Sequence, residues 1–240
     1  MKIVEKIIRK QSSLSQNPAV TIALIGDSVT QGCFECYTDD KGDLQTVFDY
    51  ESSYGNRLRG MLNTLYPNVP FHIINAGISG DSAPGGLQRL ERDVLSYHPD
   101  LVVVGFALND STKGVDGLPR YKDAMSEMIR KIIQSGAECI VLTPNAMTTK
   151  VSVHLKDKIN RKFAELFSGI QNRGILDRYV DTAKEAAAEN GAVVCDVYAK
   201  WKTMMAAGVD VTELLANKLN HPLRKMHYMT AEMLVETILK

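Results

Sequence analysis

The chain has 240 residues, 45% of them hydrophobic and 23% charged, which is the composition of an ordinary globular protein with a full core. Its 28 basic residues balance its 28 acidic residues, and this neutrality excludes the strongly basic surface of proteins that bind nucleic acids or anionic membranes. No run of about 18 apolar residues is present to span a membrane. The N-terminal residues lack the pattern of a secretory signal, so we expect a cytoplasmic protein.

Strand and helix patterns alternate along the chain. Short, nearly continuous runs of Val, Ile and Leu predict strands at residues 20–25, 71–75, 101–105, 138–142 and 192–195, because strands of a parallel sheet are buried on both faces. Helical patterns occupy residues 2–10, 53–65, 83–96, 120–134, 153–190 and 229–239. This alternation predicts an α/β fold in which helices cover a parallel sheet, in one domain over residues 1–240.

Two connections, residues 32–52 and 143–152, are longer than a crossover between strands requires. Long ordered loops are often functional, and Phe34 and Tyr37 in the first connection are candidates for contact with a substrate. An aromatic cluster beneath a surface loop is the alternative interpretation of these side chains.

Four cysteines are too few for a disulfide framework and fit a reducing compartment. Cys33 and Cys36 form one C-x-x-C pair, but a structural zinc site needs four ligands and the sequence holds no second pair. Two ordinary thiols are therefore the favoured interpretation, redox chemistry or a metal site is the alternative, and we predict no cofactor. Cys139 and Cys195 lie in apolar runs and are expected in the core.

The segment after the first strand carries the sequence G-D-S. Asp27 is expected to bond backbone amides or to contact a substrate, and Ser28 stands at the carboxyl end of the strand, where ligands of open α/β sheets bind. If the strand order is 2-1-3-4-5, Gly77 and Asn109 follow the two neighbouring strands and lie close to Ser28. The N–H groups of Ser28 and Gly77 and the side-chain amide of Asn109 would then surround one point, as an oxyanion hole requires.

A hydroxyl nucleophile needs a base, and the chain has five histidines. His72 and His98 enter the predicted sheet at its opposite end, and His154 and His227 are expected at helix starts as capping or packing residues. His221 lies in a proline-stiffened loop just before the last helix and is the favoured base.

The segments GDSVTQG, NAGISG, ALND and NHP, in this order and at these separations, resemble the SGNH hydrolase superfamily, also called GDSL esterases or lipases. The resemblance runs from about Ile22 to the C-terminus. It implies a three-layer α/β/α sandwich with a five-stranded parallel sheet, Ser28 as nucleophile, His221 as base, and Gly77 and Asn109 as oxyanion donors beside the Ser28 amide. The first and last motifs are most similar to bacterial members that resemble carbohydrate esterases.

Two positions depart from the pattern of that family. Lys218 stands where the family has an Asp three residues before the base, and an ammonium group cannot accept a hydrogen bond from an imidazole. The amide oxygen of Asn217, a main-chain carbonyl of the same loop, or Asp210 folded back are the candidate substitutes, and we expect lower activity than with a full triad. Ala107 replaces a glycine, and its methyl group is expected to narrow the pocket beside Asn109.

These residues predict a serine esterase that acts on a small-molecule ester, and the resemblance favours an acetyl ester on a carbohydrate. No nucleic-acid partner is expected. A lysophospholipase or thioesterase is the alternative reaction, and a ligand-binding protein without turnover is the alternative that the missing Asp raises. A nucleotide or phosphate binder is disfavoured, because the glycine-rich segment 77–86 lacks phosphate-binding motifs and carries Asp81, which is expected to cap the next helix.

Overall fold

A parallel sheet of five strands forms the centre of the computed structural model, which describes residues 1–240. The strands of the chain are β1 (Val20–Gly26), β2 (Cys33–Thr38), β3 (Leu44–Phe48), β4 (Phe71–Gly77), β5 (Leu101–Gly105), β6 (Glu138–Leu142) and β7 (Val193–Cys195). The α-helices are α1 (Lys2–Ser12), α2 (Ser28–Gln31), α3 (Tyr54–Leu65), α4 (Ala83–Asp93), α5 (Leu118–Gln134), α6 (Lys158–Asn172), α7 (Ile175–Asn190), α8 (Val197–Ala206) and α9 (Arg224–Leu239).

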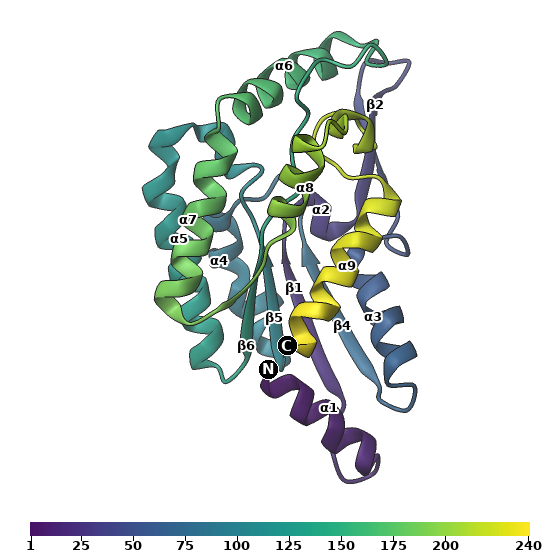
Figure 1. Ribbon diagram of the computed structural model, residues 1–240, viewed down its shortest axis with the longest axis vertical. Coiled ribbons are helices and arrows are strands. Elements are labelled where there is room, and N and C mark those ends of the chain that lie inside the picture. The colour runs from purple at the N-terminus through teal and green to yellow at the C-terminus, as the bar shows by residue number, and fades with distance from the viewer.

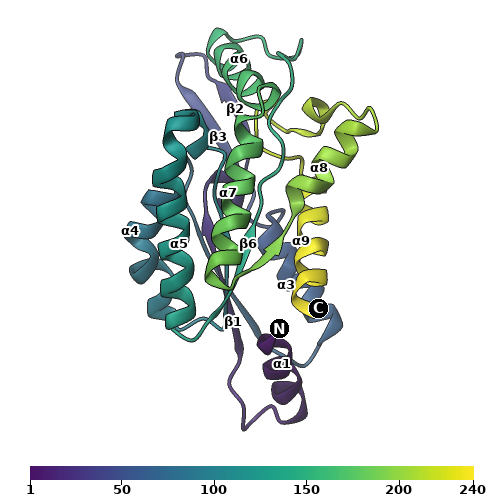
Figure 2. The same cartoon turned by 60° about the vertical axis from the view of Figure 1, so that its left-hand side comes forward.

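The strands of the central sheet run in the order β4-β1-β5-β6-β7, all parallel. Helices α4, α5 and α7 cover one face, and α3 and α9 cover the other (Figures 1 and 2). The predicted α/β class, parallel sheet and strand order 2-1-3-4-5 are thus confirmed. All residues of β1 except Thr21 are buried, and all residues of β5 except Gly105 are buried. Because both faces of these strands lie in the core, their hydrophobic runs are nearly continuous.

The helices differ from the predicted ones mainly at their ends. The region 153–190 is two helices, α6 and α7, separated at Gly174, whose φ of 69° breaks the helical path. Helix α4 ends at Asp93 and a short 3-10 helix, Leu95–Tyr97, follows it, so the predicted helix 83–96 is divided. Helix α9 begins at Arg224, five residues before the predicted start, and α8 was not predicted. None of the helices combines the length and apolar character that crossing a membrane demands.

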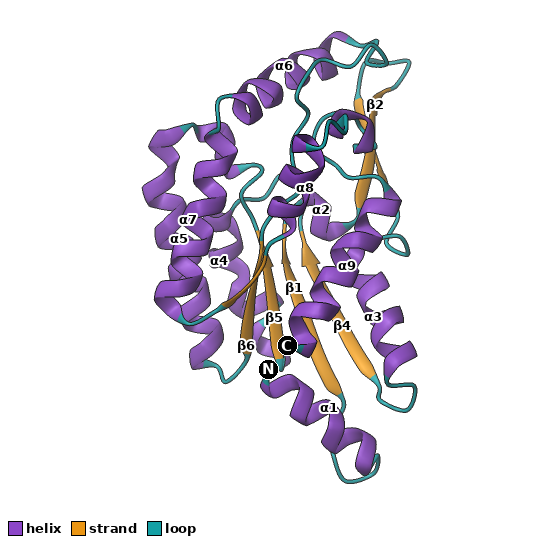
Figure 3. Ribbon diagram, in the orientation of Figure 1, coloured by secondary structure: helices purple, strands orange, loops and turns teal.

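The segment 32–52, expected to be a long loop, contains an antiparallel hairpin of β2 and β3. Its turn is stabilised by Asp39, whose carboxylate accepts hydrogen bonds from the N–H groups of Lys41 and Asp43, and by Gly42 with a φ of 88°. The hairpin rises beyond the carboxyl edge of the central sheet, where α2 also begins (Figure 3). It therefore stands next to the end of β1 that carries Ser28.

Candidate active site

A tight turn after β1 places Ser28 at the carboxyl edge of the sheet. Gly26 is required in this turn, because a Cβ there would lie 2.2 Å from the hydroxyl oxygen of Thr30. Asp27 caps α2 and accepts a hydrogen bond from the Val29 N–H at 2.9 Å. Ser28 is the first residue of α2, and its backbone N–H makes no hydrogen bond within the chain.

His221 reaches Ser28 from the loop that precedes α9. Its Nε2 lies 2.9 Å from the Ser28 Oγ, and the two residues are only 5% and 4% exposed. The loop is held by Asn217, whose Oδ1 accepts hydrogen bonds from the backbone N–H groups of Leu219, Asn220 and His221, each at 3.0 Å. A hydroxyl in hydrogen-bond contact with an imidazole is the arrangement of a nucleophile and its general base.

The second ring nitrogen of His221 faces the backbone of β2. Its Nδ1 lies 3.2 Å from the carbonyl oxygen of Phe34, which can only accept, so Nδ1 carries the hydrogen and Nε2 keeps the lone pair that faces Ser28. The role expected for Asn217 is therefore not observed, because its amide oxygen is taken by the loop backbone and its nitrogen donates to Asn220 at 3.1 Å. The group that accepts from Nδ1 is a main-chain carbonyl, as one of the expected alternatives had it, but it belongs to the hairpin and not to the loop of His221.

The two charged residues near this loop have other partners. The ammonium of Lys218 pairs with the carboxylate of Glu213 at 2.9 Å. Asp210 pairs with Lys150 and caps a short 3-10 helix by accepting the N–H of Thr212 at 3.2 Å. Asp210 therefore does not replace the missing acid.

The glycine expected to donate to an oxyanion is already engaged. The N–H of Gly77 donates to Asn75 Oδ1 at 3.0 Å, and a Cβ at this position would lie 2.3 Å from the backbone nitrogen of Gln31. Gly77 thus permits β4 to pack closely on α2. Gly80, three residues later, lies in an exposed turn with a φ of 79°, and its N–H makes no hydrogen bond within the chain. Gly80 is therefore the glycine of NAGISG whose N–H remains free to donate, whereas Gly77 was the predicted donor.

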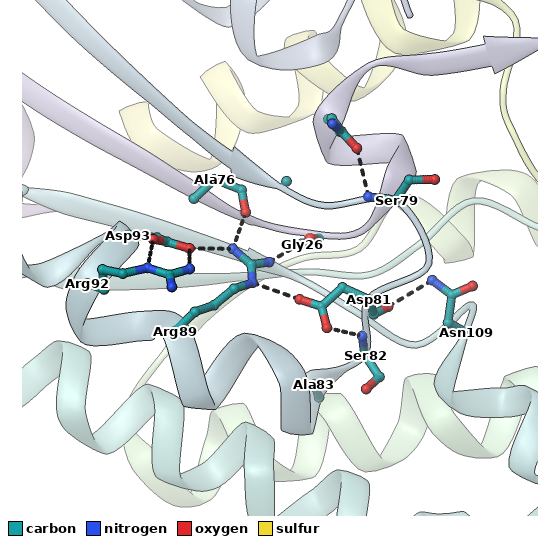
Figure 4. A network of polar contacts seen from close by, with 12 residues as sticks. Gly26, Ala76, Ser79, Asp81, Ser82, Ala83, Arg89, Arg92, Asp93 and Asn109 are labelled. Atoms are coloured by element: carbon teal, nitrogen blue, oxygen red, sulfur yellow. Dashed lines mark hydrogen bonds and ion pairs between the residues drawn. The ribbon is translucent and has the colours of Figure 1, made fainter. Parts of the chain in front are cut away.

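Asn109 follows β5, and its Nδ2 donates to the carbonyl oxygen of Asp81 at 2.8 Å, which leaves its second amide hydrogen free (Figure 4). The turn that contains Asp81 is bound to the sheet by Arg89, a buried residue of α4 that no sequence motif marks. Arg89 donates to the Asp81 carboxylate at 2.8 Å and to the carbonyl oxygens of Ala76 at 2.6 Å and Gly26 at 3.1 Å (Figure 4). One guanidinium thus connects the ends of β1 and β4.

Residues 24–228 match the model of the GDSL-like lipase/acylhydrolase family, which is most of the chain. The chain belongs to this family. Its enzymes are carboxylic ester hydrolases, and the serine–histidine contact at the edge of the sheet lies within the matched residues.

The curated relatives of this GDSL-family chain are distant. An acetylxylan esterase of Geobacillus stearothermophilus is 29% identical over 102 residues, which are 42% of this chain and 44% of that protein. The thioesterase 1/protease 1/lysophospholipase L1 of Escherichia coli strain K12 is 26% identical over 152 residues, 63% of this chain and 60% of that protein. The chain thus aligns with less than two thirds of the length of either relative.

Solved structures share the fold over nearly the whole chain. Axe2, an acetylxylan esterase from Geobacillus stearothermophilus, superposes with a TM-score of 0.66 at 19% identity and covers 91% of this chain and 94% of its own. A two-domain esterase (CEX) active on acetylated mannans gives a TM-score of 0.66 at 18% identity, covering 98% of this chain and 52% of its own. At these identities the likeness establishes the architecture.

Two side chains expected to contact a substrate are inside the protein. Asp27 is 3% exposed, and Phe34 is fully buried between the ring of His227, with centroids 4.7 Å apart, and the guanidinium of Arg224, 4.3 Å from its ring. The ring of Phe34 is therefore not positioned to bind a substrate, and Phe34 contributes its carbonyl oxygen instead, while the Asp27 carboxylate caps α2. Tyr37, in contrast, is 52% exposed on the hairpin.

Ala107, at the position where the family has a glycine, affects the backbone of the GDSL fold. Its φ of 151° lies in a region that residues with a side chain rarely adopt, and the residue is fully buried. The sequence suggested that this methyl group narrows a pocket beside Asn109. The structure shows it buried instead, in a strained segment of the backbone that leads to Asn109.

Two buried carboxyl groups, those of Asp27 and Asp110, accept backbone hydrogen bonds at the site, and for Asp27 such a bond was expected. Burial raises the pKa of Asp27 to about 6, although the Val29 amide and the charge of His221 lower it. Burial likewise raises the pKa of Asp110 to about 7, and this carboxyl accepts the N–H of Ala83 at 3.0 Å at the start of α4. Asp110 thus caps the helix that Asp81 was expected to cap.

A thiol also approaches the base. The Cys36 Sγ lies 3.8 Å from Nδ1 of His221. A hydrogen bond from the Cys33 thiol holds the pKa of Cys36 below its usual value, against the effect of burial, and His221 lowers it further. The same interaction, with burial, raises the pKa of Cys33.

Proposed function

We propose that the protein hydrolyses small acyl esters through a covalent acyl-Ser28 intermediate. The observation that carries the proposal is the 2.9 Å contact between Ser28 Oγ and His221 Nε2, with Nδ1 held by the Phe34 carbonyl oxygen. This geometry fixes the tautomer of a general base next to a nucleophile without a carboxylate.

The reaction follows from these contacts. His221 takes the hydroxyl proton of Ser28 as Oγ attacks the ester carbonyl carbon, and the resulting imidazolium then protonates the leaving alcohol. A water molecule repeats the attack on the acyl-Ser28 ester, with His221 again as base, and the acid is released. The Phe34 carbonyl stabilises the imidazolium less than a carboxylate would, so we expect slower turnover than in an enzyme with a full triad.

The negative oxygen of the tetrahedral intermediate needs hydrogen-bond donors. We assign this role to the N–H groups of Ser28 and Gly80 and to the free amide hydrogen of Asn109, which all belong to segments at the carboxyl edge of the sheet. Each such donor contributes about 3 kcal/mol to stabilisation of the transition state.

The low exposure of Ser28 and His221 favours a small acyl group, because a bulky one needs more room around Oγ than these buried side chains offer. We propose an acetyl ester carried by a saccharide. Relatives named for acetylated xylan and mannan support this choice, and the exposed ring of Tyr37 offers an apolar surface on which a sugar can stack. A longer acyl chain, which the thioesterase and lysophospholipase relative favours, is the second candidate.

The central test is the Ser28→Ala variant, assayed with 4-nitrophenyl acetate and with acetylated xylooligosaccharides. We expect its hydrolysis rate to fall to the background and its reaction with a fluorophosphonate probe to disappear. The matched control is Ser79→Ala. Ser79 is an exposed serine of the neighbouring turn, and its only hydrogen bond is the one that its backbone N–H donates to Gln31 Oε1 at 2.7 Å. Unchanged turnover in Ser28→Ala would remove Ser28 from the mechanism, and a wild-type protein that the probe does not label would indicate ligand binding without catalysis.

A panel of acetyl, butyryl and octanoyl esters distinguishes the two substrate classes. We expect kcat/KM to decrease as the acyl chain lengthens. A preference for the octanoyl ester would favour the thioesterase or lysophospholipase class instead.

A further inference from the structure

Two thiols and the catalytic imidazole form a cluster beside Ser28. The Sγ atoms of Cys33 and Cys36 and a ring nitrogen of His221 all lie within 4.8 Å of one another, and neither cysteine is in a disulfide. The nitrogen that faces Cys36 is Nδ1, at 3.8 Å. A metal site was only the alternative interpretation of the C-x-x-C pair, because the third member of the cluster, His221, lies far from the pair in the sequence.

A β-bulge brings the two thiols to the same face of the hairpin. Side chains three residues apart in a regular strand point to opposite faces. Cys33 pairs with Phe48 and Cys36 pairs with Thr46, so three steps along β2 match only two steps along β3. The extra residue in β2 restores the alternation by one position and turns both sulfur atoms toward His221.

The separation between Cys36 Sγ and His221 Nδ1 suits a tetrahedral cation with thiolate and imidazole ligands, and the Cys33 sulfur lies within 4.8 Å of both. Zn–S bonds of about 2.3 Å and Zn–N bonds of about 2.0 Å place a sulfur and a nitrogen ligand about 3.6 Å apart, and two sulfur ligands about 3.8 Å apart. The 3.8 Å between Cys36 Sγ and Nδ1 is within a few tenths of an ångström of that separation. Soft thiolate ligands favour Zn²⁺ and its heavier analogue Cd²⁺ over Mg²⁺ or Ca²⁺.

We propose that Cys33, Cys36 and Nδ1 of His221 form an inhibitory binding site for a thiophilic divalent cation, with Zn²⁺ as the natural class of ligand. Binding releases the two thiol protons and moves the imidazole proton from Nδ1 to Nε2, since the metal takes the lone pair of Nδ1. Nε2 then donates to Ser28 and has no lone pair to accept the Ser28 proton. Metal occupancy and nucleophile activation are therefore mutually exclusive.

The test is titration of the reduced, metal-free 240-residue protein with Cd²⁺, which reports bound thiolates by an ultraviolet charge-transfer band. We expect one equivalent to generate the band of two thiolates, to abolish ester hydrolysis in the same titration, and to be reversed by EDTA. In Cys33→Ser we expect basal hydrolysis to be retained and the midpoints of band and inhibition to shift at least about tenfold, since even outer-shell changes cost that much. Cys139→Ser, which removes a buried thiol of β6, should leave both midpoints unchanged.

Inhibition of Cys33→Ser at the wild-type Cd²⁺ concentration, or absence of the band in the wild-type protein, would overturn the proposal. If the serine variant does not fold, as judged by its thermal unfolding, Cys33→Ala provides the same comparison. The inhibition rests on the proposed esterase function, whereas the absorbance does not. A protein that binds Cd²⁺ but neither hydrolyses esters nor reacts with the fluorophosphonate probe would refute the proposed function alone.

Discussion

Asp27 lies next to the nucleophile, and replacing it by Asn should stabilise the folded protein at neutral pH. Burial raises the pKa of this carboxyl from 3.8 to about 6, even though the Val29 amide donates to it and His221 favours its ionised form. That difference corresponds to about 3 kcal/mol by which the ionised carboxylate destabilises the folded state relative to the unfolded chain. An Asn side chain keeps an oxygen for the Val29 N–H and carries no charge to desolvate.

The sign of the pH dependence follows from the raised pKa. Well below pH 3.8 the carboxyl is protonated in both states and imposes no penalty, and the penalty grows between pH 3.8 and about pH 6, where only the folded state retains the proton. Urea unfolding should therefore show Asp27→Asn to be more stable than the wild type by about 3 kcal/mol near pH 7.5, and by only about 1 kcal/mol near pH 4.5.

Asp157→Asn is the matched control, because Asp157 caps α6 by accepting the N–H of Asn160 at 2.7 Å. Burial raises the pKa of Asp157, but the hydrogen bonds from the backbone and side chain of Asn160 outweigh it and leave the pKa lowered. This substitution should therefore destabilise the protein at neutral pH, and less so in acid. If Asp27→Asn were also destabilising near pH 7.5, or if its effect did not vary with pH, the electrostatic reasoning would be wrong.

Three further substitutions test the site. Asn109→Ala should lower kcat about 100- to 1,000-fold with little change in KM, through loss of one oxyanion donor, and a loss below tenfold would contradict that role. Tyr37→Ala should raise KM for acetylated xylooligosaccharides but not for 4-nitrophenyl acetate, and an equal change for both would argue against sugar stacking. Ala107→Gly should raise the midpoint of thermal unfolding, because release of about 1–3 kcal/mol of backbone strain exceeds the loss of about 0.8 kcal/mol for a buried methyl group; a lower midpoint would show that packing dominates.

The central sheet could be predicted from the sequence because its strands are buried on both faces, so that hydrophobic runs alone mark β1 and β5. The hairpin was missed for the opposite reason. No residue of β3 is fully buried, and only the first two residues of β2 are, so its residues show no such run. Pairing between β2 and β3 and a turn at Asp39 define it instead.

Among the site residues, the contact between Ser28 and His221 could be predicted because it depends on side-chain chemistry. The partner of His221 Nδ1 was not, since it is the backbone carbonyl of Phe34 and every residue has such a group. Gly77 and Gly80 could not be distinguished by spacing, because the difference lies in which N–H is already bonded. Which backbone groups are free and which are bonded depends on tertiary contacts, and a local sequence pattern carries no information about these.

The loss of the family's Asp leaves the imidazolium of His221 without a carboxylate on Nδ1, and Asp27 supplies part of the missing charge from another direction. Burial dominates the raised pKa of Asp27, yet the positive charge of His221 favours its ionised form. The attraction between the two charges is mutual, so loss of the Asp27 charge removes a favourable interaction from the imidazolium that forms during the reaction. Asp27→Asn should therefore lower kcat above pH 6 while it raises stability, because buried charges at active sites often favour activity at the expense of stability. If kcat measured near pH 7.5 were unchanged in this variant, the charge on Asp27 would have no part in catalysis, and the Phe34 carbonyl oxygen would remain as the hydrogen-bond acceptor of Nδ1.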